Sequence, residues 1–127
     1  MIKYMNLIGI KARKASEYKV TTEVKNKVLN DYAKLIKNEK KFIINQNSKD
    51  INYARKKGLK ENLIKRLHLN ENKLDGIINS ILKIAKLRDP IDSTLEKWKR
   101  PNGLNIKRVS IPIGVIGVIY ESRPNVT

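Results

Sequence analysis

Apolar side chains recur at steps of three and four along residues 1–88, which predicts a series of helices. The clearest helix begins after Asn70, whose side chain suits an N-cap, and it carries a single apolar stripe. The stripe consists of Leu74, Ile77, Ile78, Ile81, Leu82 and Ala85. Asp89 precedes Pro90 and is therefore driven out of helical geometry, so the helical region is predicted to end there.

The segment before this helix is predicted to contain further, less regular helices. Residues 1–16 favour a first amphipathic helix, and Thr21 or Thr22 is predicted to cap a second one. The apolar positions of the second helix, which are expected to face the core, are Val24, Val28, Tyr32, Leu35 and Ile36.

Two shorter helices are predicted between residues 39 and 57. The first covers residues 39–46, and Ser48 is predicted to cap the second, over residues 49–57. Gly58 is expected to end it, because glycine tolerates the left-handed backbone of a helix C-terminus. A short helical turn is then expected around Leu63, Ile64 and Leu67.

The pattern changes after Pro90 and predicts β-structure. Asn102-Gly103 is a strong signal for a hairpin with a type I′ turn, because both residues tolerate a positive φ. The hairpin would join a strand over residues 93–99 to one over residues 104–111. Trp98 lies on this hairpin, where it can pack in the sheet.

Residues 113–120 form a continuous apolar run without polar alternation, which is typical of a strand buried on both faces in a parallel sheet. One such strand needs ladder partners, so the run predicts the opening of a larger α/β domain. The polar turn that follows contains Arg123, which can meet a phosphate, and Asn125, which can donate to an oxyanion. Ser122, Pro124 and Asn125 are also ordinary turn formers, so both a structural and a functional role of this turn remain open.

Composition narrows the classes of protein. The 127 residues suffice for one domain or a piece of a larger one, and the formal net charge is +16. Lysine outnumbers arginine 21 to 7, and no aromatic residues interleave with the basic ones as a stacking platform would need. The excess of basic residues is therefore more typical of solvated surface positions than of a site for specific nucleic-acid recognition.

Several kinds of site are not indicated by the sequence. The chain has no cysteine, so it supplies neither a thiolate nucleophile nor a thiolate metal ligand, and His68 has no neighbouring carboxylates at ligand spacing. No metal site is expected. Gly114 and Gly117 are too weak a pattern for dinucleotide binding. The apolar stretch near residue 115 is half a membrane span, and we expect a cytoplasmic protein.

Two runs carry a resemblance to a known family. They are residues 100–104 (RPNGL) and residues 108–127 (RVSIPIGVIGVIYESRPNVT), and they resemble the N-terminal portion of the γ-glutamyl phosphate reductases, which belong to the aldehyde dehydrogenase superfamily. Upstream features agree with the same family: residues 23–26 in a capped helix, Asp50, residues 54–59, Arg66-Leu67 and Asp89-Pro90. The resemblance covers almost the whole chain.

This resemblance implies an α/β fold with three parts. Residues 1–90 would form an N-terminal helical layer, residues 91–112 a hairpin of the kind used for oligomerisation, and residues 113–127 the first strand and turn of an incomplete, Rossmann-like dinucleotide-binding domain. The chain is then a truncated member of the family, in which a homo-oligomer is expected for the full-length enzyme.

The activity implied is the NADPH-dependent reduction of L-glutamyl 5-phosphate to L-glutamate 5-semialdehyde and phosphate, in proline biosynthesis. A cysteine thiolate of such enzymes attacks the acyl carbon, phosphate leaves, and hydride reduces the thioester. By resemblance, Asn125 would stabilise the oxyanion, Ile119, Tyr120 and Glu121 would lie against the cofactor, and Arg123 would contact substrate. Since the nucleophile is absent from this chain, residues 1–127 alone are predicted to be inactive.

Two other classes of function stay open at this point. One is a small basic helical module that binds nucleic acid or an acidic protein partner. The other is a structural fragment that assembles with a separately encoded remainder.

Overall fold

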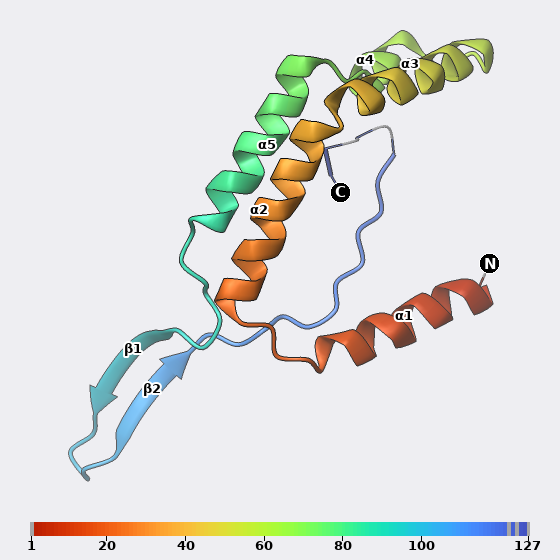
Figure 1. Cartoon of the computed structure of the whole chain (residues 1–127). Coiled ribbons are helices and arrows are strands. Elements are labelled where there is room, and N and C mark those ends of the chain that lie inside the picture. The colour runs from red at the N-terminus through yellow and green to blue at the C-terminus, as the bar shows by residue number, and fades with distance from the viewer. Residues whose placement is uncertain (1, 122, 124, 127) are drawn as a thin grey trace. The chain divides into compact units, whose positions relative to one another are not determined.

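The computed structural model describes residues 2–121, 123, 125 and 126 (Figure 1). The elements are α1 (Ile2–Ser16), α2 (Thr22–Asn38), α3 (Lys40–Lys56), α4 (Glu61–Leu67), α5 (Glu71–Ala85), β1 (Thr94–Lys99) and β2 (Asn105–Val109). They fall into two compact units, Met1–Thr22 with Arg88–Gly117 and Glu23–Leu87 with Val118–Thr127. The predicted sequence of helices followed by a hairpin is confirmed, whereas a Rossmann-like sheet is not seen in the described residues.

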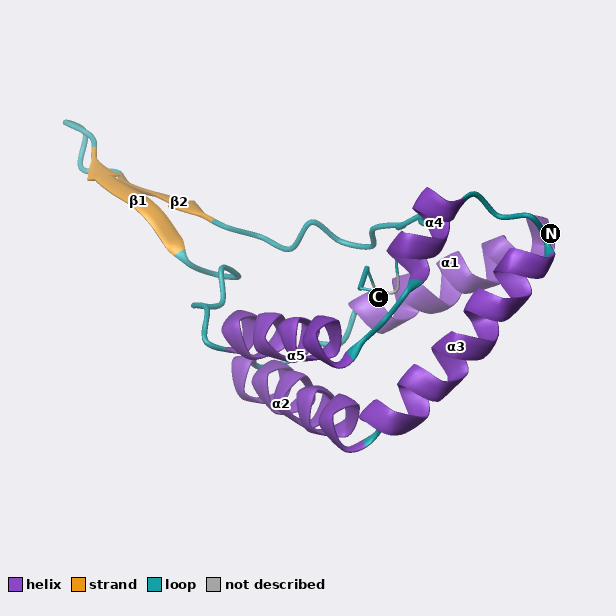
Figure 2. Ribbon diagram, turned by 90° about the horizontal axis from the view of Figure 1, so that it is seen from above, coloured by secondary structure: helices purple, strands orange, loops and turns teal. Residues whose placement is uncertain are grey.

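The core of the second unit lies where α2 and α5 run side by side (Figures 1 and 2). The predicted stripe of α5 is confirmed, since Leu74, Ile78, Ile81 and Ala85 are buried. The Asn70 cap is confirmed as well, because its side chain accepts a hydrogen bond of 2.9 Å from the backbone N–H of Lys73. The cap and the stripe together explain why the sequence forms a helix here and which face it buries.

The predicted core face of α2 is wrong in most of its residues. Val24, Val28, Tyr32 and Leu35 are exposed, by 43–61%, and Ile36 alone of the predicted set is buried. The face that packs against α5 is formed by Leu29, Ala33 and Ile36. Because apolar residues cover about half the circumference of α2, one neighbouring helix cannot cover all of them. We refer to Val24, Val28, Tyr32 and Leu35 as the outer face of α2.

The predicted break at Ser48 is also wrong, because α3 continues from Lys40 to Lys56. The Ser48 hydroxyl donates to the Ile44 carbonyl at 3.0 Å, so it is satisfied inside the helix and caps nothing. Ile51 and Ala54, beyond the predicted break, pack against Ile64 of α4, and this contact favours one continuous helix. Tertiary packing here overrides a local capping signal.

The predicted stop at Gly58 is confirmed. Gly58 has a φ of 72°, its N–H donates to the Arg55 carbonyl, and the N–H of Leu59 donates to the Ala54 carbonyl, both at 3.0 Å. These two bonds are those of a Schellman motif, in which a left-handed residue satisfies the last helical carbonyls. Leu59 then packs against Ile51, Ala54 and Ile64 and so directs the chain into α4.

Asn47 of α3 fixes the connection between α4 and α5. Its side chain is buried, donates to the Leu67 carbonyl at 3.0 Å and accepts from the Leu69 N–H at 2.7 Å. Leu69 is thereby held in the core beside α2 and α5. The amide of Asn47 therefore satisfies one backbone acceptor, the Leu67 carbonyl, and one backbone donor, the Leu69 N–H, that lie between two helices.

Replacing Asn47 with alanine is expected to lower the free energy of unfolding of the chain by about 1–3 kcal/mol, because it leaves the buried Leu69 N–H unsatisfied. Chemical denaturation followed by circular dichroism measures the change. The matched control is Asn45→Ala on the exposed side of the same helix, for which we expect a change within about 0.5 kcal/mol. Equal stabilities of the two variants would contradict the role given to Asn47.

β1 and β2 form an antiparallel hairpin, with Trp98 opposite Ile106 and Lys99 opposite Asn105. The predicted type I′ turn is wrong, because Asn102 is not among the described residues with a positive φ, whereas Gly103 has a φ of 88°. Instead, Gly103 N–H donates to the Arg100 carbonyl and Arg100 N–H to the Leu104 carbonyl, each at 2.9 Å. A two-residue turn would need an N–H from Pro101, which proline lacks, so the loop takes a third residue.

Asp89 organises the base of the hairpin. Its carboxylate accepts from the Thr22 hydroxyl at 2.9 Å and from the Ile91 N–H at 3.0 Å. The end of the helical region was predicted at Asp89, yet α5 ends earlier, at Ala85. The three residues in between, 86–88, connect α5 to Asp89.

The run over residues 113–120 is not a strand in this structure, contrary to the prediction. Its side chains are exposed, with Ile113 at 93% and Ile119 fully exposed. A strand needs a neighbour for its backbone N–H and C=O groups, and the hairpin pairs only β1 with β2. The described residues therefore contain an apolar run that is typical of a buried strand, but none of them forms a neighbouring strand that pairs with it.

α1 is confirmed as a helix, and its apolar side chains Tyr4, Leu7 and Ile8 are exposed. None of the helices in the described residues is long and apolar enough to span a bilayer.

Candidate functional site

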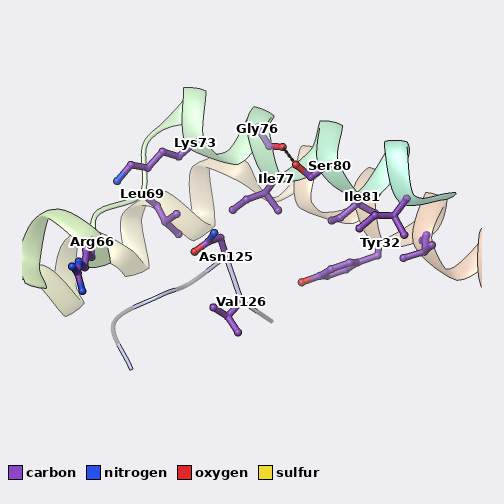
Figure 3. Close-up of a pocket in the computed structure, with 12 residues that line it drawn as sticks. Tyr32, Arg66, Leu69, Lys73, Gly76, Ile77, Ser80, Ile81, Asn125 and Val126 are labelled. Carbon is purple, nitrogen blue, oxygen red and sulfur yellow. Dashed lines mark hydrogen bonds between the residues drawn. The ribbon is translucent and has the colours of Figure 1, made fainter. Parts of the chain in front are cut away.

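A groove of about 690 Å³ lies on the second unit, between α2 and α5. Its residues come from α2, the end of α4, the connection to α5, the whole length of α5 and the C-terminal segment (Figure 3). They are Leu29, Tyr32, Arg66, Leu69, Lys73, Gly76, Ile77, Ser80, Ile81, Ile84, Asn125 and Val126. The lining is therefore an apolar floor with a few polar groups and no carboxylate.

The floor of the groove follows from the helix pairing. Leu29 and Ile81 belong to the edge of the core, and Leu69 is held there by Asn47. Ile77 packs against the same core, and the exposed Ile84 continues the apolar surface along α5. The groove is thus the place where the apolar residues of the core reach the surface of the unit.

Two of the polar groups are already bonded within the fold. The Lys73 ammonium donates to the Lys65 carbonyl at 3.2 Å and to the His68 carbonyl at 2.5 Å, and it thereby neutralises the carbonyls at the C-terminal end of α4. The Ser80 hydroxyl donates to the Gly76 carbonyl at 2.9 Å. Both groups are therefore structural in this arrangement.

Arg66 and Asn125 are different. Within the described part of the chain, neither side chain makes a hydrogen bond or an ion pair. Figure 3 shows Asn125 extending from the C-terminal segment toward Leu69 and Ile77, with Arg66 at one end of the groove. A guanidinium and an amide N–H beside an apolar floor can donate hydrogen bonds to an anionic or carbonyl oxygen.

The structure does not bring the predicted site residues together. Asn125 lines the groove, whereas Ile119, Tyr120, Glu121 and Arg123 are exposed and do not line it. The Arg123 carbonyl accepts from the Val126 N–H at 3.1 Å, which confirms a turn at this position. The polar turn is therefore present, but the assignments of cofactor and substrate contacts remain predictions.

Sequence reasoning missed the groove, because it treated the stripes of α2 and α5 as wholly internal. The signal was available in α2, whose apolar residues occupy two neighbouring stripes. His68 is exposed at the C-terminal end of α4. The described residues contain no group of three or more His, Asp or Glu side chains that could hold a metal ion.

Comparison with known proteins finds that this chain is similar to part of several reductases. It is 43% identical to the γ-glutamyl phosphate reductase of Halothermothrix orenii over 94% of this chain, and 38% identical to that of Persephonella marina over 98%. These matches cover 30% and 28% of the two relatives. No family model matches the chain.

Solved structures give the same result. The fold is similar to the crystal structure of γ-glutamyl phosphate reductase from Thermotoga maritima, with a TM-score of 0.81 and 40% identity over 91% of this chain and 28% of that one. For the enzyme from Saccharomyces cerevisiae the TM-score is 0.88, with 31% identity over 94% of this chain and 31% of that one.

The resemblance expected from the sequence is thus confirmed: the chain is homologous to the N-terminal portion of γ-glutamyl phosphate reductases. It spans about 30% of the length of the curated relatives that it matches.

Proposed function

We propose that this chain supplies the N-terminal portion of a γ-glutamyl phosphate reductase. The observation that carries the proposal is the joint similarity of sequence and fold, 43% identity to one curated reductase and a TM-score of 0.88 to another. It favours an enzyme over a nucleic-acid-binding module, for which the fold offers no comparable support. The proposed reaction is the reduction of L-glutamyl 5-phosphate to L-glutamate 5-semialdehyde, a step of proline biosynthesis, in the cytoplasm.

In the proposed reaction a thiolate attacks the acyl carbon and phosphate departs, so a thioester forms before the reduction. The attack places negative charge on the acyl oxygen, which a fixed donor must stabilise. We propose Asn125 as that donor, since its amide makes no hydrogen bond within the described residues. Arg123, which is exposed, is proposed to attract the phosphate of the substrate. The thiolate comes from outside this chain, which has no cysteine.

NADPH is the proposed reductant. The described residues do not by themselves fit a dinucleotide, because Ile119, Tyr120 and Glu121 are exposed and do not line the groove. We therefore propose that most of the cofactor site lies in the remaining 70% or so of a complete reductase, against which these three residues pack. A homo-oligomer, with the hairpin at the subunit contact, is proposed for that complete enzyme.

A chimera tests this proposal. It joins residues 1–127 to the C-terminal portion of the Halothermothrix orenii reductase that the match leaves uncovered. We expect the chimera to oxidise NADPH in the presence of L-glutamyl 5-phosphate. Residues 1–127 alone and the C-terminal portion alone are expected to give only background rates, because each lacks part of the site.

Two results would contradict the proposal. The first is a chimera with a native-like circular dichroism spectrum and a cooperative thermal transition but no activity. The second is turnover by residues 1–127 alone that is lost in the Asn125→Ala variant.

A further inference from the structure

We infer that the groove and the outer face of α2 form one contact surface for the C-terminal portion of a γ-glutamyl phosphate reductase. This inference rests on the proposed function, because that function supplies the identity of the partner. It concerns a different property of the chain, namely which of its surfaces becomes buried in the complete enzyme.

The exposed apolar side chains are ordered along α2 and are not scattered over it. Val24, Val28, Tyr32 and Leu35 follow one another at steps of four, four and three residues, so they lie on one side of the helix. Tyr32 also lines the groove, and the outer face is therefore continuous with the apolar floor. Isolated exposed apolar residues are normal in proteins, but a continuous patch marks an interaction surface.

The chemistry of this surface identifies the kind of partner. The groove has an apolar floor, and its charged lining residues, Arg66 and Lys73, are both basic. Lys73 is already bonded to two backbone carbonyls, which leaves Arg66 as the cation for a partner. A matching surface would be apolar, with an acidic or carbonyl oxygen opposite Arg66.

The length of the relatives and the path of the chain point to one occupant. About 70% of each curated relative lies outside the match, so a large part of a complete reductase remains to be packed against this portion. Val126, near the C-terminal end of the match, already lies in the groove (Figure 3). The polypeptide that follows this position in the relatives therefore starts at the surface that we assign to it.

Hydroxyl-radical footprinting with mass spectrometry tests the inference on both the 127-residue chain and the chimera. We expect the exposed fraction of Tyr32, 43% in this chain, to fall below about a tenth in the chimera, so that its oxidation slows by about fivefold. Tyr53, which is 64% exposed on α3 and lines no part of the groove, is the internal control and is expected to change little.

A pair of variants gives a second readout that does not depend on activity. Leu35→Asp is expected to leave the melting temperature of the 127-residue chain nearly unchanged, since Leu35 is exposed there, but to lower that of the chimera by several degrees. Lys34→Asp, an exposed neighbour on α2, is expected to change neither protein in this way.

Three results would overturn the inference. Tyr32 could be oxidised equally fast in both proteins, or Leu35→Asp could be equally harmless in both. Protection of Tyr32 in the 127-residue chain that grows with protein concentration would instead assign the surface to a second copy of the chain. A chimera that is inactive but protects Tyr32 would contradict the proposed function and leave the contact surface supported.

Discussion

Replacing Asn125 with alanine is expected to lower kcat of the chimera by about 10²–10³-fold, which is the usual effect of removing one oxyanion donor. The Asn125 amide can donate to the oxygen that becomes negatively charged when the acyl carbon is attacked. Alanine keeps the backbone of the turn but offers no side-chain donor. Steady-state kinetics with NADPH and L-glutamyl 5-phosphate measure the change, and KM is expected to vary less than kcat.

The matched control for this prediction is Asn62→Ala. Asn62 is exposed on α4 and does not line the groove, so its replacement is expected to leave kcat within about twofold of the parent chimera. Equal rates for Asn125→Ala and the parent would rule out Asn125 as an oxyanion donor. A loss of thermal stability equal in both variants would exclude unfolding as the cause of any difference.

Replacing Leu74 with alanine is expected to lower the free energy of unfolding of the chain by about 2–5 kcal/mol. Leu74 is 2% exposed and belongs to the core shared by α2 and α5. Truncation removes its buried methyl groups and leaves a cavity between two helices. Urea denaturation followed by circular dichroism at the helix band measures the change.

Ile84→Ala on the same helix is the control for this prediction. Ile84 is 54% exposed, so its truncation is expected to cost no more than about 0.5–1 kcal/mol in the 127-residue chain. A smaller loss of stability for Leu74→Ala than for Ile84→Ala would place the core elsewhere.

The elements of the helical region were predictable where a local signal and a packing signal agree. In α5, the Asn70 cap and the stripe from Leu74 to Ala85 both indicate the same helix, and the structure confirms it. At Ser48 the local signal indicated a cap, but the contacts of Ile51 with α4 require that the helix continue. A single sequence does not reveal which of two conflicting signals the packing satisfies.

The burial pattern of α2 shows a second limit of prediction from a single sequence. Periodicity identifies the apolar positions of a helix, but it does not tell which of them a neighbour will cover. Val28 and Leu35 fit the helical period as well as Ala33 and Ile36, yet only the latter two meet α5. The difference depends on the crossing of the two helices, which is a property of the assembled fold.

The candidate site, too, could be predicted from the sequence only in part. Asn125 was identified from the polar turn that follows an apolar run, and it lines the groove. The contributions of Arg66 and Tyr32 depend on how α2, α4 and α5 converge, and no local motif encodes that convergence. The predicted strand over residues 113–120 lacks a partner among the described residues, so sequence pattern and structure differ there for lack of a ladder.

The phosphate dependence of the chimera tests the central claim most directly. In the reverse direction, an acyl phosphate reductase needs phosphate to release the acyl group, whereas an aldehyde dehydrogenase that uses water does not. We predict that the chimera reduces NADP⁺ with L-glutamate 5-semialdehyde when phosphate is present, and that the rate falls to background without it. An equal rate without phosphate, or no reaction in a folded chimera under either condition, would contradict the assignment of this chain to a γ-glutamyl phosphate reductase.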